Sequence, residues 1–156
     1  DSRETALLAV RSELDALPHG WHATHGVRLG GMHIDHIVTG PFGVVAFTTK
    51  FHPRARVTTD GRRMQVNGVE VDHLGDTRIR ARRLRGLFSA EPMDQLSVAG
   101  GLVFVGSAEC ELPDIECDTV VSVAGRLEHT LARLPHQLSA GEVLAATQTV
   151  HRLADA

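Results

Sequence analysis

The sequence predicts an α/β (α+β) domain in which a mixed sheet is flanked by helices. Apolar residues recur at helical spacing near both ends of the chain, whereas the segments between residues 21 and 51 show the alternation and β-branched content of strands. Turns rich in Gly and Pro separate these segments, and no internal repeat interrupts them. A length of 156 residues fits one domain, which we expect to span residues 1–156.

The first third of the chain predicts one helix followed by three strands. Apolar positions at helical spacing predict a helix over 2–17, with Ser2 as its N-cap. Gly30 and Gly31 predict a turn between the first two strands. We expect strands at 21–29, 32–39 and 44–51.

A hairpin is predicted where the turn Gly40-Pro41-Phe42-Gly43 separates two apolar runs. Side chains alternate between the two faces of a strand, so the residues of 32–39 fall into two sets. One predicted face carries Ile34, His36 and Val38, and the other carries His33, Asp35, Ile37 and Thr39.

The rest of the chain predicts a small meander, then a helix, two strands and two helices. Asp60-Gly61 and Asn67-Gly68 predict tight turns within the meander, about 55–71. Gly100-Gly101 inside an apolar strand predicts close packing, and Ser139 with Glu142 forms a capping-box pattern. The expected elements are helices at 75–88, 126–134 and 139–153 and strands at 98–106 and 119–123.

Charge is distributed unevenly along the chain. Residues 50–88 hold one lysine and nine arginines against four acids, a net charge of +6, whereas 1–49 carry −2 and 89–156 carry −7. This basic middle segment predicts a local patch for an anion such as phosphate. The alternative is a solvated helix face that happens to be rich in arginine.

Several classes of protein are excluded or disfavoured by what the sequence lacks. No apolar run is long enough for a membrane span, and no signal peptide is visible, so we expect a cytoplasmic location. P-loop, GxGxxG and GxSxG motifs are missing. Two cysteines, Cys110 and Cys117, are too few for a disulfide framework, and we expect free thiols in an acidic loop. The chain begins without Met, so we expect a segment of a longer protein whose other domains are partners.

Two charged residues on the predicted hairpin form the candidate site. Lys50, the only lysine of the chain, ends the strand 44–51, and Asp35 lies on the preceding strand. A carboxylate there can hold a divalent metal, and an ammonium can face a phosphate or an attacking water. The alternative on geometry alone is a cross-strand salt bridge at a sheet end.

The stretch IDHIVTGPFGVVAFTTK, residues 34–50, resembles the core of the nuclease-related domain (NERD), a branch of the PD-(D/E)XK nuclease superfamily. Ile34-Asp35-His36 matches the opening of that core, Gly40-Pro41-Phe42-Gly43-Val44 matches its turn, and Lys50 matches its terminal lysine. The resemblance covers about 3–106 and leaves 107–156 as a C-terminal strand and helices. The runs FTTKFHP and VNGVEVDHLGDTR are similar to an actinobacterial branch of the family.

The resemblance implies a restriction-endonuclease-like αβββαβ core and hydrolysis of phosphodiester bonds in DNA that depends on Mg²⁺ (or Mn²⁺). Asp35 and Glu4 would be metal ligands, and Lys50 would position or activate the attacking water. The arginines of the helix 75–88 would hold backbone phosphates: Arg78, Arg80, Arg82, Arg83 and Arg85. Because aromatic residues are few and Tyr is absent, we expect contact with a duplex backbone rather than base stacking.

One position departs from the family pattern. Thr48 stands where the family places its second acid, and a neutral hydroxyl is a poor magnesium ligand. We therefore expect catalysis to be weak or lost, with no cofactor in the second case. Replacement acids would be Glu4, Glu70 or Asp76, and the histidine alternatives, His33 and His52, would favour manganese or zinc. Two rival hypotheses are a non-catalytic interaction or targeting module of a larger protein and a domain that shares only the fold.

Overall fold

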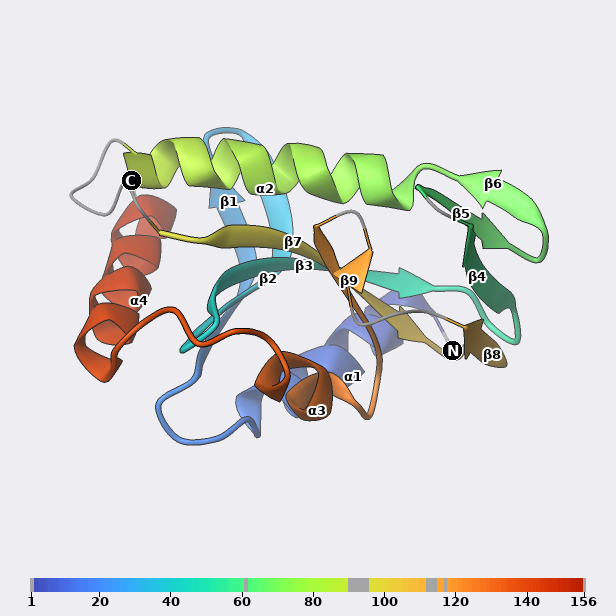
Figure 1. The fold of residues 1–156 in the computed structure, drawn as a ribbon, viewed down its shortest axis with the longest axis horizontal. Coiled ribbons are helices and arrows are strands. Elements are labelled where there is room, and N and C mark those ends of the chain that lie inside the picture. Colours follow the sequence, from blue (N-terminus) through green and yellow to red (C-terminus); the bar gives the residue numbers. More distant parts are fainter. Residues whose placement is uncertain (1, 61, 90–95, 112–114, 117, 156) are drawn as a thin grey trace.

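The computed structural model describes residues 2–60, 62–89, 96–111, 115–116 and 118–155. A six-stranded mixed sheet forms its centre (Figure 1). The first three strands of this sheet are antiparallel, and the fourth runs parallel to both of its neighbours. In spatial order the strands are β1 (His22–Leu29), β2 (Met32–Gly40), β3 (Gly43–Phe51), β7 (Val98–Val105), β10 (Thr119–Val123) and β9 (Ile115–Glu116).

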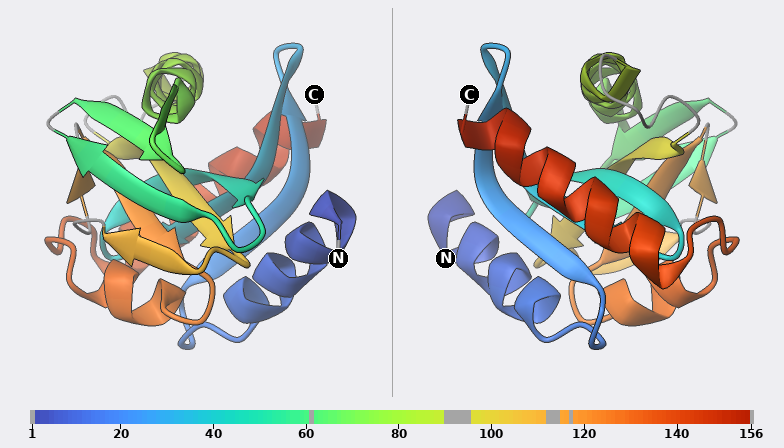
Figure 2. Two further views of the ribbon diagram at one scale, coloured as in Figure 1. Left: turned by 90° about the vertical axis from the view of Figure 1, so that its right-hand side faces the viewer. Right: turned by 90° about the vertical axis from the view of Figure 1, so that its left-hand side faces the viewer.

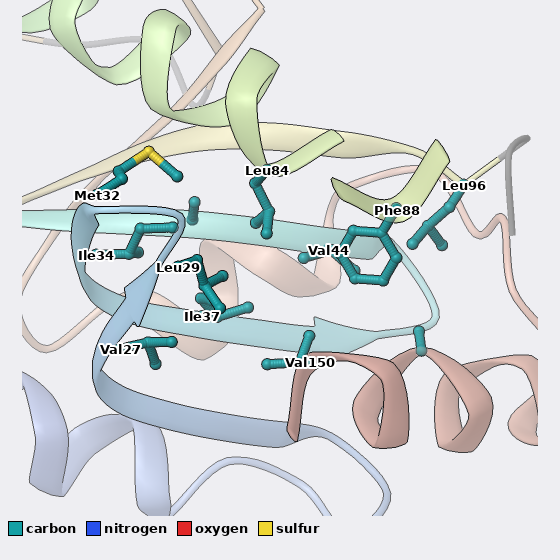
Figure 3. Packing of buried hydrophobic residues seen from close by; sticks show 12 residues of the cluster. Val27, Leu29, Met32, Ile34, Ile37, Val44, Leu84, Phe88, Leu96 and Val150 are labelled. Carbon is teal, nitrogen blue, oxygen red and sulfur yellow. The ribbon is translucent and has the colours of Figure 1, made fainter. Parts of the chain in front are cut away.

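Helices cover both faces of this sheet, as the sequence predicts. On one face lie α2 (His73–Ser89) and α4 (Ala140–Asp155), whose Leu84, Phe88 and Val150 pack against Ile37 and Val44 (Figure 3). On the other face lie α1 (Arg3–Asp15) and α3 (Leu127–Ala132), which together with the sheet enclose a second apolar cluster (Figure 1). Among the described residues, no helix combines the length and the apolar character that crossing a membrane requires.

A smaller sheet lies beside the main one and contains the predicted meander. Its strands are β6 (Val69–Val71), β5 (Arg63–Val66), β4 (Arg56–Asp60) and β8 (Glu109–Glu111), in that order. Val57 and Met64 of this sheet pack against Leu102 and Phe104 of β7. The positive φ angles of Asn67 and Gly68, 52° and 80°, confirm one predicted tight turn. The other turn includes Gly61, which lies outside the described residues.

The prediction of a loop around the cysteines is wrong for Cys110. This residue lies in β8, which pairs with β4 in parallel and so extends the smaller sheet. The pairing joins segments more than fifty residues apart, a contact that local turn signals do not encode. Cys110 has a free thiol, as predicted, and burial raises its pKa. Cys117 lies outside the described residues.

The predicted helix caps are confirmed at both ends of the chain. Ser2 accepts a hydrogen bond from the Thr5 N–H at 3.2 Å and caps α1. At the start of α4, Ser139 and Glu142 exchange two hydrogen bonds, of 2.9 and 3.2 Å, each from a backbone N–H to the other side chain. Hydrogen bonding of the Glu142 carboxylate to the backbone N–H of Ser139, and then to the Ser139 side chain, holds its pKa below the usual range.

The β1–β2 hairpin curls out of the plane of the sheet, which corrects the predicted faces of β2 (Figure 2). Ile34 packs in the same apolar cluster as Ile37, although strict alternation predicts that it accompanies Val38. Gly26, opposite Asp35 in the ladder, has a φ of 59°, and the strand pairs on either side skip this position. The left-handed glycine lets the hairpin bend here, so alternation does not continue through Asp35.

Candidate functional site

Asp35 lies at the point where β2 separates from β3. The paired residues of the hairpin end at His36 and Phe47, and beyond them β3 continues by pairing with β7. The Thr49 N–H, on the edge that β2 has left, donates a hydrogen bond of 2.9 Å to Asp35 Oδ2. Where the backbone pairing of β2 and β3 ends, the Asp35 side chain thus accepts the hydrogen bond of a β3 backbone N–H, and this contact fixes the position of the carboxylate.

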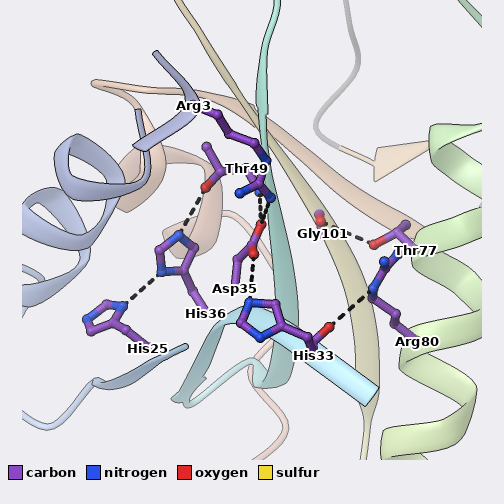
Figure 4. Close-up of polar contacts among 9 residues, drawn as sticks. All are labelled: Arg3, His25, His33, Asp35, His36, Thr49, Thr77, Arg80 and Gly101. Atoms are coloured by element: carbon purple, nitrogen blue, oxygen red, sulfur yellow. Dashed lines mark hydrogen bonds and ion pairs between the residues drawn. The ribbon is translucent and has the colours of Figure 1, made fainter. Parts of the chain in front are cut away.

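Two further side chains hold the Asp35 carboxylate, which is only 3% exposed (Figure 4). Arg3 Nη2, from the first turn of α1, donates to Oδ2 at 3.0 Å. His33 Nε2 lies 3.3 Å from Oδ1. A buried carboxylate needs such partners because burial without them is very unfavourable. Sequence reasoning missed Arg3, which sits next to Glu4 and carries no local signal of its contact with β2.

A cavity of about 340 Å³ opens over Asp35 between the start of α1, β2, β3 and α2. Thr48 lines it together with Asp35, so the two positions that the family pattern pairs do share one site. Arg80 Nε donates to the His33 carbonyl oxygen at 3.4 Å, which ties α2 to the hairpin across the cavity. The other residues that line the cavity are Arg3, Met32, His33, Asp76, Ile79, Arg80 and Arg83. Three arginines against two aspartates leave this lining with a net positive charge.

Lys50 adds to this positive charge. It lies two residues beyond Thr48 on β3 and therefore on the same face of the strand, as predicted. Burial lowers its pKa, the Arg80 guanidinium lowers it further, and Asp76 opposes them. The predicted antiparallel hairpin is confirmed, and its two ends bring Asp35 and Lys50 within electrostatic reach of each other.

Other candidate residues lie away from the cavity. Glu4 is exposed on α1 and does not line it. Glu70 is exposed on β6 and lies 3.7 Å from Arg63. On α2, the residues facing the cavity are Asp76, Ile79, Arg80 and Arg83, which follow helical spacing. Arg78 and Arg82 are exposed elsewhere on that helix, and Arg85 donates to the Leu96 carbonyl oxygen at 2.7 Å.

The donors around Asp35 do not match the set that Mg²⁺ prefers. Magnesium sites in proteins are built from carboxylate oxygens and water, with near-octahedral geometry. Here Asp35 is paired with a guanidinium, and Thr48, which lines the same cavity, offers a neutral hydroxyl where the family pattern has an acid. Among the described residues, no group of three or more His, Cys, Asp and Glu side chains is arranged to hold a metal ion.

A chain of polar contacts, which sequence reasoning missed, supports the site from behind (Figure 4). His25 Nε2 donates to Asp15 Oδ1 at 2.7 Å, the Nδ1 atoms of His25 and His36 lie 2.8 Å apart, and His36 Nε2 lies 3.0 Å from Thr49 Oγ1. The directions of the last two hydrogen bonds depend on the tautomers of the two rings. The Gly30-Gly31 turn places His25 opposite His36, so the hairpin register was the signal available in the sequence.

A second histidine pair lies beyond Lys50. His52 and His73 stack with their Nε2 atoms 2.9 Å apart. Burial lowers the pKa of His52, with a further contribution from Lys50. Burial also lowers the pKa of His73 to about 4, assisted by the charges of Lys50 and His52. Both rings are therefore neutral near pH 7 and do not add to the positive charge of Lys50.

Acid is expected to destabilise the fold between about pH 6.5 and pH 4. Burial, followed by the charge of His25, lowers the pKa of His36 to about 4 from an ordinary 6.5. In that interval the unfolded chain binds a proton at this residue and the folded chain does not, so stability falls as the pH falls. At about 1.4 kcal/mol per pKa unit the loss from this ring is at most about 3 kcal/mol. Urea unfolding at pH 7, 5.5 and 4 measures it.

The matched control for this titration is His19→Gln, because His19 is exposed. His36→Gln should lower stability at pH 7 but flatten the decline between pH 6.5 and pH 4, whereas His19→Gln should leave the decline unchanged. A decline as steep in His36→Gln as in wild type would show that this ring is not its source.

A mixed sheet flanked by helices, with an aspartate and a lysine on a hairpin beside a cationic cavity, is consistent with a nuclease-like domain. The chain belongs to the nuclease-related domain (NERD) family, whose sequence model matches residues 3–105. Comparisons with curated proteins and with solved structures give no match. Family membership makes this a nuclease-related protein, and its ligand and its chemistry depend on the particular side chains of the site.

Proposed function

We propose that this domain binds DNA through the phosphates of its backbone and that its metal-dependent phosphodiesterase activity is weak or lost. The observation that carries the proposal is the Arg3–Asp35 ion pair of 3.0 Å inside a cavity whose second acid position is Thr48. The Arg3 guanidinium binds the Asp35 carboxylate, which by the family resemblance would be a metal ligand. The positive lining of the cavity favours a phosphate there even without a metal.

Weak catalysis follows from the same arrangement. A metal ion would have to displace Arg3 from Asp35, and it would gain only one carboxylate in return. Lys50 can still face a phosphate, since it lies two residues beyond Thr48 on β3 and an ammonium binds anions as a point charge. We further propose that the chain belongs to the actinobacterial branch of the family, because the run FTTKFHP resembles that branch.

The arginines that line the cavity should dominate DNA affinity. Replacing Arg80 and Arg83 with Ala is expected to weaken binding of a short duplex about tenfold and to flatten its salt dependence by about one unit of slope per lost phosphate contact. Fluorescence anisotropy across a series of salt concentrations measures both quantities.

The double variant Arg78→Ala, Arg82→Ala is the matched control, because it removes the same charge from the same helix away from the cavity. It should reduce affinity by a smaller factor. Equal losses in both double variants would show a diffuse effect of charge on α2. No binding by the wild type at low salt would refute the proposal and favour a non-catalytic interaction or targeting module.

A further inference from the structure

A second cavity, of about 200 Å³, lies on the other side of Asp35, between α1 and the β1–β2 hairpin. His33 and Asp35 line both cavities, so the two spaces meet at these side chains. The second cavity differs in chemistry from the first. Its walls include Leu7, Leu8 and Gly26 together with the rings of His25 and His36, and Arg11 also lines it.

Three features of these walls leave room for a flat and partly apolar ligand. Leu8 is 65% exposed, although a large apolar side chain on an amphipathic helix is usually buried. At Gly26 a Cβ atom would meet nothing within 4 Å, so the space beside the hairpin backbone is open. Arg11 is 58% exposed and forms an ion pair of 3.9 Å with Asp15; a planar guanidinium that is paired through its edge can still stack on a flat partner.

We propose that the two cavities form one binding site for a nucleotide whose base is unpaired. The phosphate lies in the cationic cavity with Arg80 and Arg83, and the base enters the apolar cavity between Leu8 and Arg11. A nucleotide combines an anionic end with a flat and largely apolar ring, which matches the two halves of the site in charge and in polarity. This inference rests on the proposed function and adds the form of DNA that the site selects.

An unpaired base is required because a base inside a duplex is stacked and its ring faces are covered. Proteins that bind a single base in a pocket take it from a strand end, a single strand or a flipped position. Aliphatic side chains and a guanidinium can contact the base here, because no Phe, Tyr or Trp is among the described residues that line this cavity. Contact with a duplex backbone alone, which the composition favours, would leave the apolar cavity without a role.

The test compares three fluorescent DNA probes of equal length: a single strand, the same strand made entirely of abasic nucleotides, and a closed dumbbell duplex without free ends. Wild-type protein should bind the single strand at least about tenfold more tightly than the abasic strand. Leu8→Ala should reduce single-strand affinity about threefold or more and leave the affinity for the abasic strand unchanged. Leu144→Ala on α4 is the control, because Leu144 is also a helical leucine, is 52% exposed and lies outside both cavities.

The outcomes separate this inference from the function on which it rests. If all three probes bind equally and Leu8→Ala has no effect, while the Arg80 and Arg83 variant still loses affinity, the base site is refuted and phosphate binding stands. If the dumbbell duplex binds most tightly, the base site is refuted in the same way. If no probe binds, the proposed function fails and this inference fails with it.

Discussion

Thr48→Glu is expected to raise plasmid nicking in Mg²⁺ at least about tenfold above wild type, a gain of about 1.4 kcal/mol in transition-state stabilisation. Thr48 is 7% exposed and lines the same cavity as Asp35, so a carboxylate introduced there adds the second oxygen donor that a magnesium ion needs. By the family resemblance, Lys50, two residues beyond Thr48 on β3, would position the attacking water. A nicking assay in Mg²⁺ and in Mn²⁺ measures the gain.

Thr48→Gln is the matched control, because it has nearly the shape of glutamate without its charge and should nick no faster than wild type. Lys50→Ala, alone and combined with Thr48→Glu, should show no activity, since water positioning would be lost. Adding Arg3→Gln to Thr48→Glu should raise the rate further, because the guanidinium that competes with a metal for Asp35 is removed.

Other results would overturn the argument for degeneracy. If wild type already nicks efficiently and Lys50→Ala abolishes nicking, another acid has taken the place of Thr48. Asp76 would then be the first candidate, because it lines the cavity, and Glu4 the second. If none of these variants cuts DNA or binds a metal, the domain has left nuclease chemistry.

The parts of the site that the sequence predicts are those fixed by local turns. The Gly40-Pro41-Phe42-Gly43 turn sets the register of the hairpin as far as His36 and Phe47, so the residue pattern alone brings Asp35 and Thr48 to the end of the paired region. The capping box at Ser139 is local in the same sense. In such places a few neighbouring residues determine the geometry.

The parts that the sequence does not predict depend on contacts between distant segments. Arg3 reaches Asp35 only because α1 packs against the sheet, and no motif marks that contact. The sequence also does not predict which face of α2 turns toward the cavity, because arginines lie at several positions around this helix and the apolar Ile79 is 50% exposed. Its packing therefore decides that Arg80 and Arg83, rather than Arg78 and Arg82, line the cavity.

The position of α2 depends in turn on a glycine that lets the helix approach the sheet. A Cβ atom at Gly100 of β7 would lie 2.7 Å from the Thr77 carbonyl oxygen of α2 and 3.0 Å from its methyl carbon. The Thr77 hydroxyl also donates to the Gly101 carbonyl oxygen at 3.2 Å, so helix and strand are joined where they are closest. The sequence predicts close packing at this glycine pair, and these distances confirm it.

Gly100→Ala is therefore expected to lower the free energy of unfolding by about 1–3 kcal/mol, the usual range for inserting a methyl group into a packed core. The clash is with backbone, so α2 must move away from β7 and take Asp76, Arg80 and Arg83 with it. DNA affinity should then fall together with stability.

The control is Gly86→Ala on α2, where a Cβ atom meets nothing within 4 Å. That change should stabilise the protein by about 0.5–1 kcal/mol, because alanine is the better helix former, and should leave DNA binding unchanged. Urea unfolding and anisotropy titrations on both variants measure these effects. If Gly100→Ala unfolds at the same urea concentration as wild type, α2 does not depend on this contact for its place over the cavity.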